Sequence, residues 1–138
     1  KEIYVMDAES FFVPSFLNAI QENTIESFRS ILIEPIRGIY IFEMLRPQFC
    51  QKLLSEVNHI RSWTQDRIRR PHKMLEHGVV VDDFGLEPML NKFMDYFISP
   101  IAGVFYNQLG GSTLDSHLGF TVEYEIDKTV EMGLWISY

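Results

Sequence analysis

The apolar residues in the second half of the chain follow two different periods. Between residues 86 and 105 they recur every three or four positions, which is the spacing of one face of an α-helix. This set comprises Leu86, Met89, Leu90, Phe93, Met94, Phe97, Ile98, Ile101, Val104 and Phe105. From Phe120 to Ile126 apolar and polar residues instead alternate, as in a half-buried strand. A helical stripe this wide must be largely buried, so the chain has to combine a buried helix with a strand that packs on one face.

Prolines and glycines refine the prediction for this half. Pro88 suits the first turn of the long helix, and Pro100 is expected to kink its middle. Residues 110–112, Gly-Gly-Ser, predict a turn. The apolar residues of 132–136 also alternate, so we predict a second strand there.

The first residues of the chain are predicted to be mostly helical. Residues 3–5 could form a short strand, and residues 10–20 have apolar positions at helical spacing. Asn and Thr at 23–24 offer capping oxygens to a second helix over residues 25–32. That helix should end at residues 34–35, because proline disfavours a helical conformation in the residue before it.

We therefore divide the chain into a helical lead-in, residues 1–36, and a second part, residues 37–138. The second part is predicted to begin with a short strand at residues 39–42, which are β-prone. An amphipathic helix follows from Pro47 to about Trp63. Residues 65–83 indicate a loop plus an extended stretch.

Length and composition limit the class of protein. A chain of 138 residues with 46% hydrophobic residues is enough for one domain, or for part of one. The most apolar segment is interrupted by Asn91, Lys92, Asp95 and Pro100, which argues against a membrane span. Because the chain begins with Lys1 and not with methionine, we expect a fragment of a longer product.

The single cysteine, Cys50, excludes a disulfide framework within the chain. It lies between Phe49 and Leu53 in a helical pattern, so we predict a buried and unreactive thiol. Absence of disulfides is compatible with a reducing compartment, and an intracellular location, cytoplasmic or nuclear, is favoured.

The charge distribution argues against a nucleic-acid partner. The formal net charge is −7, and acidic residues predominate beyond Lys73, so this half should repel phosphate backbones. One basic cluster contains Arg67, Arg69, Arg70, His72 and Lys73. It has no interleaved aromatic residues, and a solvated helix end is favoured over a nucleic-acid site.

Three segments together resemble a known enzyme family. They are His77 to Glu87, Gly110 to His117 and Gly119 to Tyr124. They are similar to the iron(II)- and 2-oxoglutarate-dependent dioxygenases, and within these to the prolyl/lysyl hydroxylase-like branch. The similarity runs from about Glu34 to Gly133. It implies an α+β fold in which helices pack on the first strands of a double-stranded β-helix, or jelly roll. It also implies hydroxylation coupled to oxidative decarboxylation of 2-oxoglutarate, with ascorbate supporting the iron.

The end of the chain departs from the pattern of that family. In the family, a strand like that of Tyr124 is followed by a turn and then by a Gly-aromatic or Gly-Leu pair, here Gly133-Leu134, that runs directly into an H-x-D-D motif whose histidine and aspartate bind iron. Here Trp135 stands in the place of the histidine and Ser137 in that of the aspartate. Non-haem iron needs two imidazoles and a carboxylate, whereas indole has no available lone pair and serine is a poor ligand. We therefore expect a truncated, inactive product that binds no iron, 2-oxoglutarate or ascorbate.

The resemblance also gives Tyr124 a role, as a residue lining the cosubstrate pocket. A core aromatic with its hydroxyl at the surface is the competing interpretation, and it is favoured for an isolated strand tyrosine.

No other metal or catalytic site is predicted. His59, His72, His77 and His117 are each more readily explained as structural or surface residues than as ligands. Asp115 and His117 share a face if they lie on a strand, but two ligands do not make a site. We reject a Ser112, Asp115 and His117 triad because such close neighbours lack the geometry that a nucleophile needs.

A helical protein-interaction module without catalysis is the alternative function. A jelly roll opened halfway would leave strand edges and one face of the 86–105 helix uncovered, and such surfaces bind protein partners.

Overall fold

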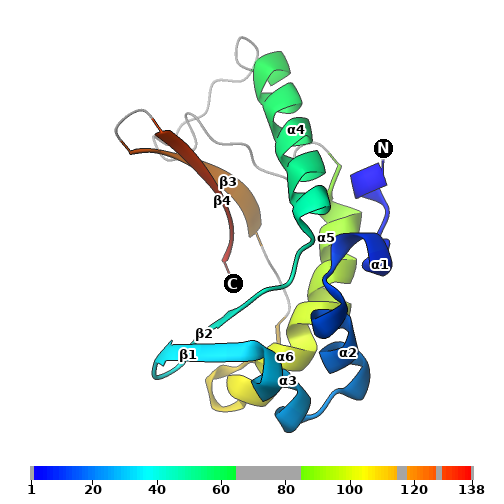
Figure 1. Ribbon diagram of the computed structural model, residues 1–138, viewed down its shortest axis with the longest axis vertical. Helices are drawn as coiled ribbons and strands as arrows, with labels where there is room; N and C mark the ends of the chain where they lie inside the picture. The colour runs from blue at the N-terminus through cyan, green and yellow to red at the C-terminus, as the bar shows by residue number, and fades with distance from the viewer. Residues whose placement is uncertain (1, 65–84, 115–117, 127–128, 138) are drawn as a thin grey trace.

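The computed structural model describes residues 2–64, 85–114, 118–126 and 129–137, the last two ranges as backbone only. The described residues form a body of packed helices and two antiparallel hairpins (Figure 1). This arrangement confirms the α+β class. Within these ranges no helix is both long and apolar enough to cross a bilayer.

The lead-in contains more and shorter helices than the sequence predicts. These are η1 (Glu2–Tyr4), α1 (Ala8–Phe11), α2 (Pro14–Glu22) and α3 (Ile25–Ile31). The predicted strand at residues 3–5 is wrong, because residues 3 and 4 belong to the 3₁₀ turn η1. The predicted helix over 10–20 is divided at Phe12 and Val13, which are both extended. Pro14 explains the break, because its ring disfavours a helical Val13 while its own fixed φ suits the first position of α2.

The predicted cap between α2 and α3 is confirmed. Thr24 Oγ1 accepts a hydrogen bond from Ser27 N at 3.0 Å, and Thr24 N donates to Ser27 Oγ at 3.1 Å, which makes a reciprocal capping box. Ser27 Oγ also donates to the carbonyl oxygen of Ala19 at 3.0 Å. The buried Ser27 hydroxyl is therefore satisfied, and it links the two helices.

The chain then forms a hairpin of β1 (Leu32–Ile36) and β2 (Ile39–Phe42). The sequence predicts β2 but not β1, because its apolar spacing favours a helix over residues 25–32. The hairpin turns at Gly38, whose φ of +82° is in the left-handed region that favours glycine. Glu34 Oε1 accepts from Gly38 N at 2.8 Å and fixes this turn.

Two longer helical stretches complete the body. Helix α4 (Pro47–Thr64) matches the predicted amphipathic helix closely. The predicted long helix is confirmed as three consecutive segments, α5 (Glu87–Phe93), the π-helix η4 (Met94–Ile98) and α6 (Ser99–Phe105), followed by the 3₁₀ turn η5 (Asn107–Leu109). A π-helical turn therefore precedes Pro100, where a kink was predicted. Pro100 lies in the first turn of α6, directly after the wider π-helical turn, which is a position where proline is tolerated.

Aromatic side chains join the lead-in to the long helix. Phe12 and Phe16 are fully buried. The ring of Phe12 is stacked on that of Phe93, with centroids 5.7 Å apart, and lies 4.4 Å from the ring of Phe97. Phe16 stacks on Phe42 of β2 at 5.8 Å. The two sides of residue 36 thus share one hydrophobic core, and the division there stays a prediction from sequence.

Tyr4 fixes η1 on α4 through a hydrogen bond from its hydroxyl to Glu56 Oε1, at 2.7 Å. Partial burial, together with the bond to the Glu56 carboxylate and its negative charge, raises the pKa of Tyr4 to about 12.

We expect a Tyr4→Phe variant to be less sensitive to alkaline pH than the unchanged chain. Because the folded pKa of Tyr4 is raised, the stability that its protonated hydroxyl gives is fully present below pH 10, the ordinary pKa, and is lost as pH rises to about 12. Urea unfolding of both proteins over this range, with the other tyrosines common to both, measures the difference. Parallel pH dependence in the two proteins would contradict the assignment.

Candidate functional site

The hairpin of β3 (Leu118–Ile126) and β4 (Thr129–Ser137) carries the residues singled out by the family resemblance. It confirms both predicted strands, and Figure 1 shows it as a long curved pair beside α4. Tyr124 lies opposite Glu131, Trp135 lies opposite Phe120, and Ser137 lies opposite Leu118. Asp127 and Lys128, predicted to form the turn, lie outside the described residues.

The register places the positions of Tyr124, Trp135 and Ser137 on one face of this hairpin. Directly opposed residues share a face, and so do residues separated by an even number of positions on one strand. Tyr124 lies opposite Glu131, and positions 135 and 137 lie four and six positions beyond Glu131 on β4, so they share its face. Trp135 is four positions along β4 from Glu131, or about 13 Å. Tyr124 is therefore too far from positions 135 and 137 to share a metal ion with them, but it lies along the same surface.

The residues at these positions do not fit iron. A facial iron site takes two histidines and a carboxylate, and Trp135 and Ser137 supply neither type of donor. In the described ranges, moreover, no three His, Cys, Asp or Glu side chains lie close enough together to hold a metal ion.

The other candidate residues are dispersed or lie outside the described ranges. His59 is exposed on α4, as expected of a surface histidine. His72, His77, Asp115 and His117 lie outside the described residues, and so does the basic cluster.

The predicted burial of Cys50 is wrong, because the residue is exposed on α4. Successive helical residues are rotated by about 100°, so Cys50 points away from the stripe to which the buried Phe49 belongs. Partial desolvation of the thiol nevertheless raises the pKa of Cys50. A raised pKa disfavours the thiolate, which is consistent with the predicted lack of nucleophilic reactivity.

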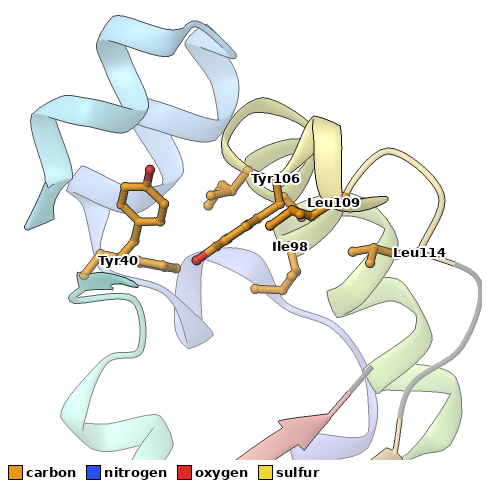
Figure 2. A pocket seen from close by; sticks show the side chains of 9 residues that line it. Tyr40, Ile98, Tyr106, Leu109 and Leu114 are labelled. Atoms are coloured by element: carbon orange, nitrogen blue, oxygen red, sulfur yellow. The ribbon is translucent and has the colours of Figure 1, made fainter. Parts of the chain in front are cut away.

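An apolar pocket of about 430 Å³, which was not predicted, lies between β2 and the end of the long helix. Its lining comprises Tyr40, Phe42, Ile98, Ile101, Ala102, Tyr106, Leu109, Gly111 and Leu114. Figure 2 shows the Tyr106 ring extending from the helix end toward the strand that carries Tyr40. The rings of Tyr40 and Tyr106 meet edge to face, with centroids 5.6 Å apart.

Tyr106 connects this pocket to the β1–β2 turn. Its hydroxyl donates to the carbonyl oxygen of Gly38 at 2.7 Å. Desolvation is the main cause that raises the pKa of Tyr106, and nearby Tyr40 and Glu34 add to it. The alternation of Tyr40 and Phe42 in the sequence could have indicated that one face of β2 is covered, but it could not name the distant Tyr106 as the partner of Tyr40.

Comparison with known proteins identifies the family of this chain. Residues 1–111 match the family described as the OGFOD2-like domain. The chain belongs to the OGFOD2-like domain family. The match includes both the lead-in and the long helix, and it ends before β3.

The relatives of this OGFOD2-like domain are named as oxygenases. The Arabidopsis thaliana protein named 2-oxoglutarate and iron-dependent oxygenase domain-containing protein CP2 is 49% identical over 140 residues, which cover 99% of this chain and 36% of that protein. A second Arabidopsis thaliana protein of that description, ICU11, is 48% identical over 99% of this chain and 35% of its own length. The Homo sapiens protein named 2-oxoglutarate and iron-dependent oxygenase domain-containing protein 2 is 28% identical over 96% of this chain and 40% of its own.

The chain thus spans little more than a third of the length of these relatives. No solved structure matches it significantly.

Proposed function

We propose that this OGFOD2-like domain belongs to a 2-oxoglutarate- and Fe(II)-dependent dioxygenase of the prolyl/lysyl hydroxylase type. The similarity to relatives named as 2-oxoglutarate and iron-dependent oxygenases, over 99% of this chain, carries the proposal. The activity proposed for the whole protein is hydroxylation of a substrate coupled to oxidative decarboxylation of 2-oxoglutarate, with ascorbate supporting the iron.

In this proposal the helical body supports the first strands of a jelly roll. The β3–β4 hairpin would form that first pair of strands, and its register supports the proposal by aligning position 124 with positions 135 and 137 on one face. Tyr124 would line the cosubstrate pocket on this face.

We further propose that residues 1–138 by themselves bind neither iron nor 2-oxoglutarate. By the family resemblance, Trp135 and Ser137 would stand where the family has its first two iron ligands, and neither side chain can replace an imidazole or a carboxylate. Without iron, the cosubstrate loses the metal that should hold its 2-oxo acid group. The chain should therefore be inactive in isolation.

Thermal unfolding in the presence of Fe(II) and 2-oxoglutarate, without oxygen, tests this proposal. A ligand at a hundred times its Kd would stabilise the folded chain by about 2.7 kcal/mol, whereas we expect no change in the melting temperature of the unchanged chain. The Trp135→His/Ser137→Asp variant supplies two of the three ligands and is the matched comparison. Because a third ligand is still missing, we expect this variant to bind Fe(II) only weakly and to be stabilised only at millimolar Fe(II), and the unchanged chain not to be stabilised at all. A cosubstrate-dependent rise in the melting temperature of the unchanged chain would contradict the proposal.

The alternative function, protein interaction without catalysis, would use strand edges and an uncovered face of the 86–105 helix. Only the first of these two surfaces remains as a candidate. The 86–105 helix buries its wide apolar stripe, including Met89, Phe93 and Phe97, in the core. Tyr96 is the large apolar side chain that remains exposed on this helix in the described ranges. The strand edges thus remain as the candidate surface, and a monodisperse monomer that binds no hydrophobic dye would exclude it.

A further inference from the structure

The β1–β2 hairpin is apolar on both of its faces. Leu32 and Phe42 pack against the core from one face. The side chains of Ile33, Ile36, Ile39 and Ile41 are between 51% and 68% exposed. Strands that are apolar on both faces are typical of sheets with a layer on each side, and the described residues cover only one side of this hairpin.

An irregularity in the hairpin gathers these four isoleucines on a single face, the isoleucine face. Ile33 lies opposite Ile41, and Ile36 lies opposite Ile39. Ile39 and Ile41 are two apart and share a face, so their partners share it too. Ile33 and Ile36 are three apart and would face opposite ways in a regular strand, but the register shifts between them. The shift therefore brings Ile36 onto the exposed side.

The two edges of the hairpin differ in their ability to accept another strand. The outer edge of β1 contains Pro35, which has no N–H to donate, and the register shift. Strand β2, Ile39–Phe42, has neither proline nor charge. Among the described strands β2 pairs only with β1, so its outer edge is the one suited to pairing.

The size and chemistry of the isoleucine face favour an occupant from the same polypeptide. Its exposed area is on the order of 400 Å², about half of the roughly 800 Å² that each partner contributes to a stable interface between separate chains. The face also lacks the Trp, Tyr and Arg side chains that dominate binding between proteins. A segment of the same chain needs less area, because its tether keeps it at a high effective concentration. The relatives have such polypeptide to supply, since this chain matches only 36% of CP2.

We propose that, in the whole protein, an apolar β-strand from outside residues 1–138 pairs with the free edge of β2 and covers the isoleucine face. The hairpin then becomes part of a larger sheet with the helical body on one side. The proposal rests on family membership and not on iron binding, so it can hold or fail independently of the proposed catalytic chemistry.

Thiol labelling can test this cover. A cysteine is placed at Ile41, in the isoleucine face, or at the exposed Ser55 of α4 as the matched control, with Cys50 replaced by serine. The buried Ala19 position, as Ala19→Cys, reports folding. Each variant is made in residues 1–138 and in a hybrid in which these residues replace the matched region of CP2. Labelling by a maleimide is followed for each site by mass spectrometry.

In residues 1–138 we expect the Ile41→Cys and Ser55→Cys sites to be labelled at similar rates. In the hybrid we expect labelling at Ile41→Cys to slow by about 100-fold, as in a buried layer, while Ser55→Cys stays fast. Slowing of less than about tenfold, with Ala19→Cys protected, would overturn the proposal. Protection of Ile41→Cys in residues 1–138 that increases with concentration would overturn it in favour of a second copy.

A second site and a second protein keep the test decisive. Ile33→Cys must show the same protection, which controls for local damage by the Ile41 substitution. If fast labelling of Ala19→Cys shows that the hybrid is unfolded, the same sites are labelled at the aligned positions of CP2 itself, with the same expected and contradicting results.

Discussion

A Phe12→Ala variant is expected to lower the free energy of unfolding by about 3–5 kcal/mol, the cost of removing a fully buried phenylalanine. Phe12 lies in the lead-in, and its ring contacts those of Phe16, Phe93 and Phe97. Collapse into the resulting space is limited, because the neighbouring rings are themselves held by α2 and by the long helix. The loss should therefore be near the upper part of the range, and urea unfolding measures it.

Tyr96→Ala is the matched control for this prediction. It removes a large aromatic side chain from the long helix, but this side chain is 64% exposed. We expect it to change the free energy of unfolding by less than about 1 kcal/mol. Similar small effects for both variants would show that the lead-in is not part of the core.

A Gly111→Ala variant is expected to lower the free energy of unfolding by about 3 kcal/mol, at the high end for overpacking. A Cβ atom at Gly111 would overlap the carbonyl oxygen of Ala102 and lie 2.9 Å from Tyr106 Cβ. The first of these is a backbone atom of α6 and cannot rotate away. Gly111 N also donates to the Tyr106 carbonyl oxygen at 2.8 Å, so the turn cannot move outward without losing this bond.

Gly103→Ala, within α6, provides the contrast. A Cβ atom at Gly103 meets nothing within 4 Å. Alanine is a better helix former than glycine by about 1 kcal/mol, so this variant should be neutral or slightly more stable. If Gly111→Ala were equally neutral in urea unfolding, the close approach of the turn to α6 would be wrong.

Local signals in the sequence predicted those parts of the fold that depend on neighbouring residues. The cap at Thr24, the start of α4 at Pro47 and the alternation in β3 each follow from the chemistry of a few adjacent positions. The strand β1 was missed because Leu32 and Ile33 continue the apolar spacing of α3, and only pairing with β2 shows that they are extended.

Features that depend on distant partners could not be predicted in the same way. The Tyr106 bond to Gly38 and the Phe12 contacts with the long helix join residues far apart in the sequence. The exposure of Cys50 depends on which side of α4 faces the core. The prediction placed Cys50 on the buried side together with its neighbour Phe49, whereas of the two only Phe49 is buried. For the candidate site, the sequence resemblance predicts that Trp135 and Ser137 stand at the family's iron-ligand positions. The strand register adds that these positions share a face with Tyr124.

Coordination chemistry decides whether residues 1–138 can bind iron by themselves. Family membership leads to the expectation of iron, whereas the side chains at positions 135 and 137 lack the necessary donors. The same argument predicts that the tertiary structure of residues 1–138 forms without metal.

Metal analysis after loading is the most direct measurement of this claim. Residues 1–138 are incubated with Fe(II) and 2-oxoglutarate without oxygen, freed of unbound metal by gel filtration, and measured for iron content. We predict iron far below one equivalent per chain, and no succinate when oxygen is then admitted. One equivalent of bound iron, with succinate released from the cosubstrate, would contradict the account.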